Sequence, residues 1–275
     1  MATIAGKFVG REPRPDLLSG TPRAHALDRW IFVFMAGWYI VITLTGFIPD
    51  SIMKVGMIQA GQRPPFPIVL HMHAVLMGSF LLTLLAQTTL MATGRRTLHM
   101  QLGIFGVALA AALVAVGCVL APTMYYQTWN ALQTAPAAAQ PQLQELLSIK
   151  ENILLLQMRI GILFPLFLAI GFRARAGNAG MHKRMMILAV APALAAGIDR
   201  ITWLPTTMPA SNLGADFWVL LAVSPMFVWD VVRNKRVHEA YWVWLGISLP
   251  FALFILAAWD TPWWHATARA IMRVG

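Results

Sequence analysis

Seven apolar stretches recur along the chain, and polar segments separate them. A helix needs about 20 predominantly apolar residues to cross a bilayer, and most of the stretches reach or approach that length. The pattern therefore predicts an all-α fold, a polytopic transmembrane helical bundle with seven spans. Six spans are the alternative, because the sixth stretch is short and contains Asp230 near its end. The predicted spans cover residues 30–48, 68–92, 100–121, 153–172, 185–204, 217–232 and 241–259.

Composition agrees with a membrane protein. Hydrophobic residues make up 58% of the chain and charged residues 12%, whereas a soluble domain carries roughly 25% charged residues. The net charge of +10 would suggest a nucleic-acid partner for a soluble protein. In a membrane protein it indicates basic cytoplasmic loops, so we expect a lipid bilayer as the surroundings and no nucleic acid.

The distribution of Lys and Arg between alternate loops predicts the orientation, because cytoplasmic loops carry the excess. With the N-terminus inside, fourteen of these residues are cytoplasmic: Lys7, Arg11, Arg14, Arg23, Arg29, Arg95, Arg96, Arg173, Arg175, Lys183, Arg184, Arg233, Lys235 and Arg236. Five are external: Lys54, Arg63, Lys150, Arg269 and Arg273. We therefore expect a polar, basic cytoplasmic tail at 1–28, a transmembrane domain at 29–260 and an external tail at 261–275.

One external loop differs from the others. Residues 122–149 are rich in Ala, Gln and Pro and almost uncharged. The segment at 140–152, QPQLQELLSIKEN, has the composition of an amphipathic helix that lies on the membrane surface. We expect it to be separate from the fourth span.

Two parts of the chain are alike. Each contains a span that opens with a polar pair, then a Gly- and Arg-containing turn, a histidine at the start of the next helix, and an Ala-rich helix. The polar pairs are His71/His73 and Gln157/Arg159, and the helix-start histidines are His99 and His182. This predicts a helix hairpin used twice, with a four-helix core from spans two to five, although apolar hairpins also resemble each other by composition alone.

His99 and His182 are the first candidate site. If the two hairpins pack side by side, both imidazoles lie at the same membrane depth, near the cytoplasmic side. Two neutral imidazoles that face each other are the axial ligands of a six-coordinate haem b. The hypothesis is a haem iron held between them, with the neighbouring basic residues available to the propionates. The alternative is two interfacial histidines that are solvated or face lipid.

The second candidate site is a group of polar residues toward the external side. An ionisable side chain within hydrocarbon costs at least about 2.5 kcal/mol and is a functional candidate by default. Arg159, Asp199 and Arg200 meet that description, and we expect Arg159 to pair with Asp199. Glu151, Lys150 and Asp216 border the same side. The group predicts a pocket in the outer leaflet for an anionic or quinone-like headgroup, or a proton relay, and a purely structural ion pair is the alternative.

His73 and Gln87 are assigned to the same pocket. They are fourteen residues apart in the second span, which places them within about 40° of one helix face. His71 faces elsewhere, because successive helical residues turn by about 100° and the HxH pair diverges by about 200°. A histidine bonded to a neighbouring helix is the alternative for His73.

The stretch from His71 to Gly103, together with MHKRMMILA and IDR at 181–200, resembles bacterial membrane proteins of the DUF2306-like kind. That family has a histidine at a span start, a later Gln, a Gly/Arg turn and a following HxxLG, and it implies a bacterial inner (cytoplasmic) membrane. The paired hairpins are also distantly similar to cytochrome b561 and the ferric reductases. Those four-helix proteins sandwich two haems between histidines, and this chain offers ligands for the inner haem only.

The leading hypothesis is a redox-associated integral membrane protein that binds haem b between His99 and His182. The alternative is a non-catalytic subunit of a membrane complex, or a carrier that binds a small molecule, quinone or lipid in the outer pocket. The sequence contains no phosphate-binding glycine loop, nucleophile elbow or HExxH motif. No motif therefore names a reaction, and whether the protein is an enzyme is left open.

Overall fold

The computed structural model describes residues 16–19 and 25–274 of the chain. Within these residues it is all-α, without strands, and seven segments are long and apolar enough to cross a membrane. The prediction of a polytopic helical bundle is confirmed. The helices are α1 (Ala26–Gln59), α2 (Ile68–Ala92), α3 (Arg96–Thr134), α4 (Gln140–Ala174), α5 (Ala179–Leu188), α6 (Ala191–Ile198), α7 (Leu213–Asn234), α8 (Glu239–Ala258) and α9 (Pro262–Met272), with short 3₁₀ turns η2 (Leu17–Ser19) and η3 (Ala137–Ala139).

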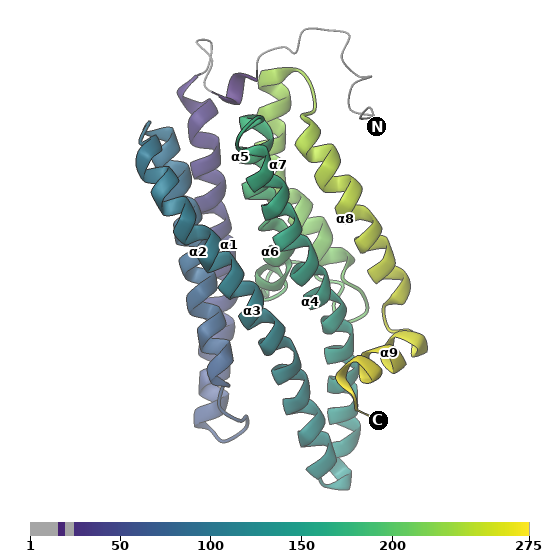
Figure 1. Ribbon diagram of the computed structural model, residues 1–275. Helices are drawn as coiled ribbons and strands as arrows, with labels where there is room; N and C mark the ends of the chain where they lie inside the picture. The colour runs from purple at the N-terminus through teal and green to yellow at the C-terminus, as the bar shows by residue number, and fades with distance from the viewer. Residues whose placement is uncertain (1–15, 20–24, 275) are drawn as a thin grey trace.

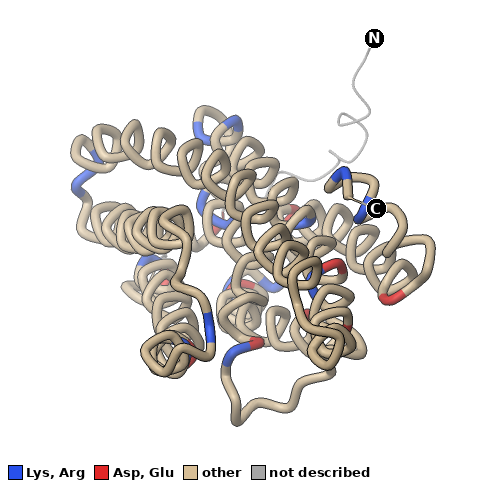
Figure 2. The backbone as a smooth tube through the Cα atoms, turned by 90° about the horizontal axis from the view of Figure 1, so that it is seen from below, with Lys and Arg blue, Asp and Glu red and all other residues tan. Residues whose placement is uncertain are grey.

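The spans run alternately up and down, so the connections collect at two ends (Figure 1). We call one end the basic end; it holds the connections at 93–95, 175–178 and 235–238, at the top of Figure 1. The opposite end, called the far end, holds the turn at 60–67, the α3–α4 connection and the residues that lead into α9. Seen along the bundle, most of the backbone is uncharged and the few charged positions are widely spaced (Figure 2). Residues 1–15 and 20–24 of the predicted cytoplasmic tail, and Gly275, are outside the described residues.

Three helices, α1, α3 and α4, extend by ten residues or more beyond their predicted ends. α1 continues through Pro49 and α3 through Pro122, at points where the apolar pattern stops. Proline is tolerated in membrane helices because neighbouring helices and small local adjustments satisfy the freed backbone groups. Residues 140–152 are helical, but they are the start of α4 and not a separate surface helix, so that expectation is wrong. α3 and α4 therefore extend beyond the other helices at the far end (Figure 1).

The fifth span consists of two helices. It begins at Ala179, where the Asn178 side chain accepts a hydrogen bond from the Met181 backbone N–H at 2.9 Å. It breaks between α5 and α6 at residues 189–190, because Pro192 has no N–H to donate to the preceding turn. It ends at Ile198, so the predicted range of 185–204 lies too far along the chain. This span is 72% buried, the most of the seven spans found in the described residues.

Small residues allow the fifth span to pack closely against its neighbours. A Cβ added to Gly46 of α1 would lie 1.9 Å from the carbonyl oxygen of Gly197 in α6, so the two backbones touch there. Close approach of this kind is how helices associate in a membrane, where small residues let dispersion contacts form. α2 to α5 form two successive hairpins in contact with each other, and the core extends beyond them to α1, α7 and α8.

The outer surface of the bundle is apolar. Large hydrophobic side chains are exposed on several of the spans, among them Ile68, Ile104, Leu82, Phe217, Val228 and Leu253. Monomeric soluble proteins rarely expose large apolar surfaces. They indicate that lipid surrounds the helices, as expected.

Candidate functional site

His99 and His182 occupy equivalent positions in the two hairpins. Each is the fourth residue of its helix, and its backbone N–H donates to the carbonyl of the residue before the helix, at 3.1 Å to Arg95 and 3.0 Å to Asn178. The two rings are half-buried at the basic end, with centroids 6.4 Å apart and planes at 84°. The structure therefore brings the two predicted histidines together.

Both imidazoles are oriented by a backbone carbonyl of the preceding helix. Nδ1 of His99 lies 3.4 Å from the carbonyl oxygen of Gln87, and Nδ1 of His182 lies 2.8 Å from that of Gly171. A carbonyl oxygen can only accept, so Nδ1 must carry the proton in each ring. In a neutral imidazole this leaves a lone pair on Nε2, and no hydrogen bond to either Nε2 is found among the described residues.

This donor set fits a haem. The two rings, with centroids 6.4 Å apart, are close enough that one iron ion could be held by both. A ligand histidine commonly donates its other ring N–H to a backbone carbonyl, which fixes the tautomer, as both rings do here. Within the described residues no group of three or more His, Cys, Asp or Glu side chains could hold a bare metal ion. Two ligands are the number that a porphyrin-bound iron leaves open for protein.

The cations near the histidines are fewer than predicted. Arg95, Arg96 and Arg175 are exposed at the same end, and Arg96 and Arg175 interact electrostatically with the two rings. Lys183 also interacts electrostatically with His182, but its ammonium group donates a hydrogen bond to the carbonyl of Leu18 at 2.9 Å. The remaining arginines are the ones that could contact an anionic group at the membrane surface.

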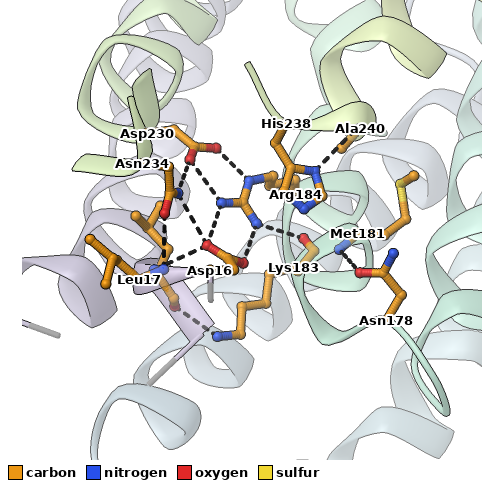
Figure 3. Close-up of polar contacts among 12 residues, drawn as sticks. Asp16, Leu17, Asn178, Met181, Lys183, Arg184, Asp230, Asn234, His238 and Ala240 are labelled. Carbon is orange, nitrogen blue, oxygen red and sulfur yellow. Dashed lines mark hydrogen bonds and ion pairs between the residues drawn. The ribbon is translucent and has the colours of Figure 1, made fainter. Parts of the chain in front are cut away.

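The charge distribution predicts that Arg184 lies in a cytoplasmic loop. The structure instead shows a fully buried residue of α5 (Figure 3). Its guanidinium binds both carboxylate oxygens of Asp230 and both of Asp16, and it also donates to the carbonyl of Gly180 at 2.9 Å. Asn234 bridges the two carboxylates, at 3.1 Å to Asp16 and 2.6 Å to Asp230. Asp230, because of which six spans were the alternative prediction, is therefore the partner of a buried arginine. The sequence signal was an acidic residue inside an apolar stretch.

His238 lies beside this cluster (Figure 3). Its Nδ1 accepts a hydrogen bond from the Ala240 backbone N–H at 3.1 Å, so the side chain caps α8. A Cβ added to Gly180 would lie 2.8 Å from Nε2, so only glycine allows this approach. Burial lowers the pKa of His238, and the positive charge of Arg184 lowers it further. The carboxylates of Asp16, Asp230 and Glu239 act in the opposite direction, and the pKa of His238 is lowered on balance.

Arg159 pairs with Asp216, at 2.8 Å from its Nη1 to a carboxylate oxygen, so the predicted Arg159–Asp199 pair is wrong. Asn212 donates to the same carboxylate at 2.7 Å. Asp199 follows the end of α6, where the hydroxyl of Thr206 is 3.4 Å away. The predicted partner is wrong because α6 ends at Ile198, so Asp199 lies outside the span. α7 starts at Leu213, which places Asp216 opposite Arg159.

The other residues assigned to the outer pocket are separate. Arg200 donates to Asp50 at 3.2 Å and lies over the ring of Phe47. Gln87 is about 21 Å along α2 from His73 and belongs with the histidine pair through its carbonyl. Nδ1 of His73 and Oε1 of Gln87 are buried without a hydrogen-bond partner. The structure does not bring these five residues into one pocket.

A polar cluster that the sequence did not reveal attaches α9 to α4. Glu151 is fully buried and accepts from His265 at 2.6 Å, from Arg269 at 2.8 Å and from Tyr125 at 3.2 Å. The Trp264 side chain also donates to the backbone carbonyl of Glu151, at 2.8 Å. More than 110 residues separate Glu151 from its α9 partners, so no local pattern could have indicated the contact.

Two arrangements can therefore bind something other than protein. The histidine pair presents two imidazole nitrogens at one membrane depth, and the Arg159–Asp216 pair lies within the bundle. The first offers two nitrogen donors and the second a buried ion pair. No protein-family model, curated protein or solved structure matches this chain.

Proposed function

We propose that this protein is a membrane-embedded electron-transfer protein that holds haem b between His99 and His182. The observation that carries the proposal is the oriented imidazole pair, with centroids 6.4 Å apart and both Nδ1 atoms turned to backbone carbonyls. Two neutral rings at one depth, each with Nε2 left over, are hard to explain as separate interfacial caps. When bound, haem supplies one-electron redox chemistry.

The chain's own residues have three tasks at this site. The carbonyls of Gln87 and Gly171 hold the imidazoles in one tautomer and increase their basicity as ligands. The exposed guanidinium groups of Arg96 and Arg175 attract anionic groups, such as carboxylates at the membrane surface. The helices that carry the pair leave both rings half-buried, which limits their contact with water.

The site's position suggests where electrons would be exchanged. It lies at the basic end, and the excess of Lys and Arg there supports our proposal that this end faces the cytoplasm of a bacterial inner membrane. At the far end, His71 and His73 are on one helix, and the described histidines there form no second facing pair. One haem near one surface would serve a partner on that surface, and this agrees with the resemblance to cytochrome b561-like proteins at the inner haem only.

An absorption spectrum of the protein purified from haem-replete cells tests the proposal. Bis-histidine haem b gives a sharp Soret band, and split visible bands appear on reduction. We expect both signals to be lost in His99→Ala and in His182→Ala, and to be retained in His71→Ala, which removes an exposed imidazole from the other end of α2. Added imidazole should restore part of the signal in the two ligand variants. A colourless, folded wild-type protein would overturn the proposal.

A further inference from the structure

A cavity of about 110 Å³ lies beside the Arg159–Asp216 pair, among α4, α6, α7 and α8. One buried water needs about 10–15 Å³ on the same scale, so the space is several times larger. Ser248 is near the middle of α8 and Asp216 is in the first turn of α7, so the cavity extends from the middle of the bundle toward the far end. Most of the wall is aliphatic, with side chains such as Leu163, Val219 and Leu249.

Three side chains of the wall carry a buried polar atom for which the described residues offer no hydrogen-bond partner. These atoms are Nε of Arg159, Nε1 of Trp244 and the hydroxyl oxygen of Ser248. Arg159 and Trp244 expose only 6% and 5% of their surface. A buried donor without a partner costs roughly 1–3 kcal/mol, so three around one cavity indicate that something accepts hydrogen bonds there.

The charge of the site selects a neutral ligand. The positive charge of Arg159 is balanced by Asp216, 2.8 Å away, and Asn212 supports that carboxylate. An added anion would bring an uncompensated charge into hydrocarbon, which is costly. The free groups are N–H donors and a hydroxyl, so a ligand with carbonyl oxygens satisfies them without adding charge.

The cavity communicates with the lipid. Leu220 of α7 and Leu249 of α8 line it and are 50% and 55% exposed on the outer surface of the bundle. α7 and α8 follow each other in the chain but make little contact. A ligand therefore enters sideways from the bilayer, and its hydrocarbon part remains between these two helices.

We infer that this cavity binds a neutral, lipid-soluble molecule with a carbonyl headgroup, which accepts hydrogen bonds from Arg159, Trp244 and Ser248 while its hydrocarbon chain lies between α7 and α8. A membrane quinone and the ester group of a glycerolipid share this chemistry. The site is distinct from the histidine pair and does not depend on haem.

Binding of two short-chain probes to the purified protein in detergent distinguishes the two sources. The probes are decyl-benzoquinone and dioctanoylglycerol, and decanoate is the charged control. We expect saturable binding of one or both neutral probes and much weaker binding of decanoate. Binding of the quinone alone identifies a quinone site, and binding of the glycerolipid alone identifies an ester-lipid site.

Variants test whether the probe occupies this cavity. Ser248→Ala and Trp244→Phe should each weaken binding about three- to tenfold, as expected for one hydrogen bond. Trp242→Phe is the matched control, because that indole is on α8 but 64% exposed and outside the cavity. Binding should persist in His99→Ala, which separates this result from the haem proposal. Absence of binding by both neutral probes, or affinities unchanged in both cavity variants, would overturn the inference and leave water as the occupant.

Discussion

Each buried arginine is matched by carboxylates from other segments of the chain. Arg184 lies between Asp230 of α7 and Asp16 ahead of η2, and Arg159 is matched by Asp216 of α7. The loss of stability differs between removing one partner of such a pair and removing both. Breaking one by removing a partner leaves an uncompensated buried charge, whereas removing both partners costs much less.

We expect a double-mutant cycle to show this asymmetry for Arg159 and Asp216. Arg159→Met or Asp216→Asn alone should destabilise the protein by about 3 kcal/mol, and the double variant by clearly less than the sum. Thermal unfolding in detergent measures the three losses. The matched control is the cycle of Arg159→Met with Asp199→Asn, whose effects should add because these side chains do not pair. Strict additivity for Arg159 and Asp216 would contradict the pairing.

His238 should make stability depend on pH. Burial and Arg184 lower its pKa in the folded protein, whereas the unfolded chain titrates at about 6.5. The unfolded state therefore binds the proton first as pH falls. The contribution of the neutral ring is complete above about pH 6.5 and is lost as pH falls toward the lowered folded pKa.

The variant His238→Asn isolates this effect, because Asn also caps a helix but does not titrate. We expect the melting temperature of the wild-type protein to fall more steeply below pH 6.5 than that of the variant. Other histidines contribute equally to both curves. Parallel curves over this range would show that His238 has no part in the pH dependence.

At the scale of helices, the contact between α1 and α6 depends on the absence of a side chain at Gly46. We expect Gly46→Ala to destabilise the protein by about 1–3 kcal/mol, the usual cost of overpacking, since the new Cβ would overlap the Gly197 carbonyl. Gly37→Ala on the same helix is the control, because nothing lies within 4 Å of its added Cβ. Equal melting temperatures for the two variants would exclude the close contact.

The all-α fold and the seven spans could be predicted from the sequence, because the length of an apolar stretch depends only on the residues of that stretch. The ends of α1, α3 and α4 could not, since helices continue past the hydrocarbon wherever tertiary contacts support them. The break in the fifth span was marked by Pro192, but six of the seven spans in the described residues contain an internal proline and only this one is split into two helices.

The candidate sites likewise divide into features set by the local sequence and features set by tertiary contacts. His99 and His182 could be paired from sequence because both come at the start of a helix after a short turn, which fixes their depth. The partner of Arg159 could not be predicted, because a shift of α6 by a few residues decides whether Asp199 or Asp216 lies opposite. The Glu151 cluster depends wholly on the docking of α9.

At the scale of the whole molecule, the uneven distribution of Lys and Arg predicts orientation. We expect reporters fused after Arg175 and Arg236 to be cytoplasmic and a reporter fused after Ala138 to be external. A green fluorescent protein fusion and an alkaline phosphatase fusion at each point give opposite signals and serve as mutual controls. Phosphatase activity after Arg175 would reverse the assignment. Because Arg184 is buried and neutralised, its removal from the count leaves thirteen against five, and the expected result is the same.

The burial of the fifth span has a consequence for how the protein is made. This span has a mean hydropathy of only 1.2, the lowest of the seven in the described residues, and it carries Arg184. The carboxylate of Asp230 that neutralises this arginine is synthesised 46 residues later. Lipid alone would not retain the segment in the interval. Asp16, the other carboxylate partner of Arg184, is synthesised first, so Asp230 completes the pairing only when α7 emerges. We therefore expect α5 and α6 to remain near the insertion channel until α7 joins them, and the three helices to enter the bilayer together.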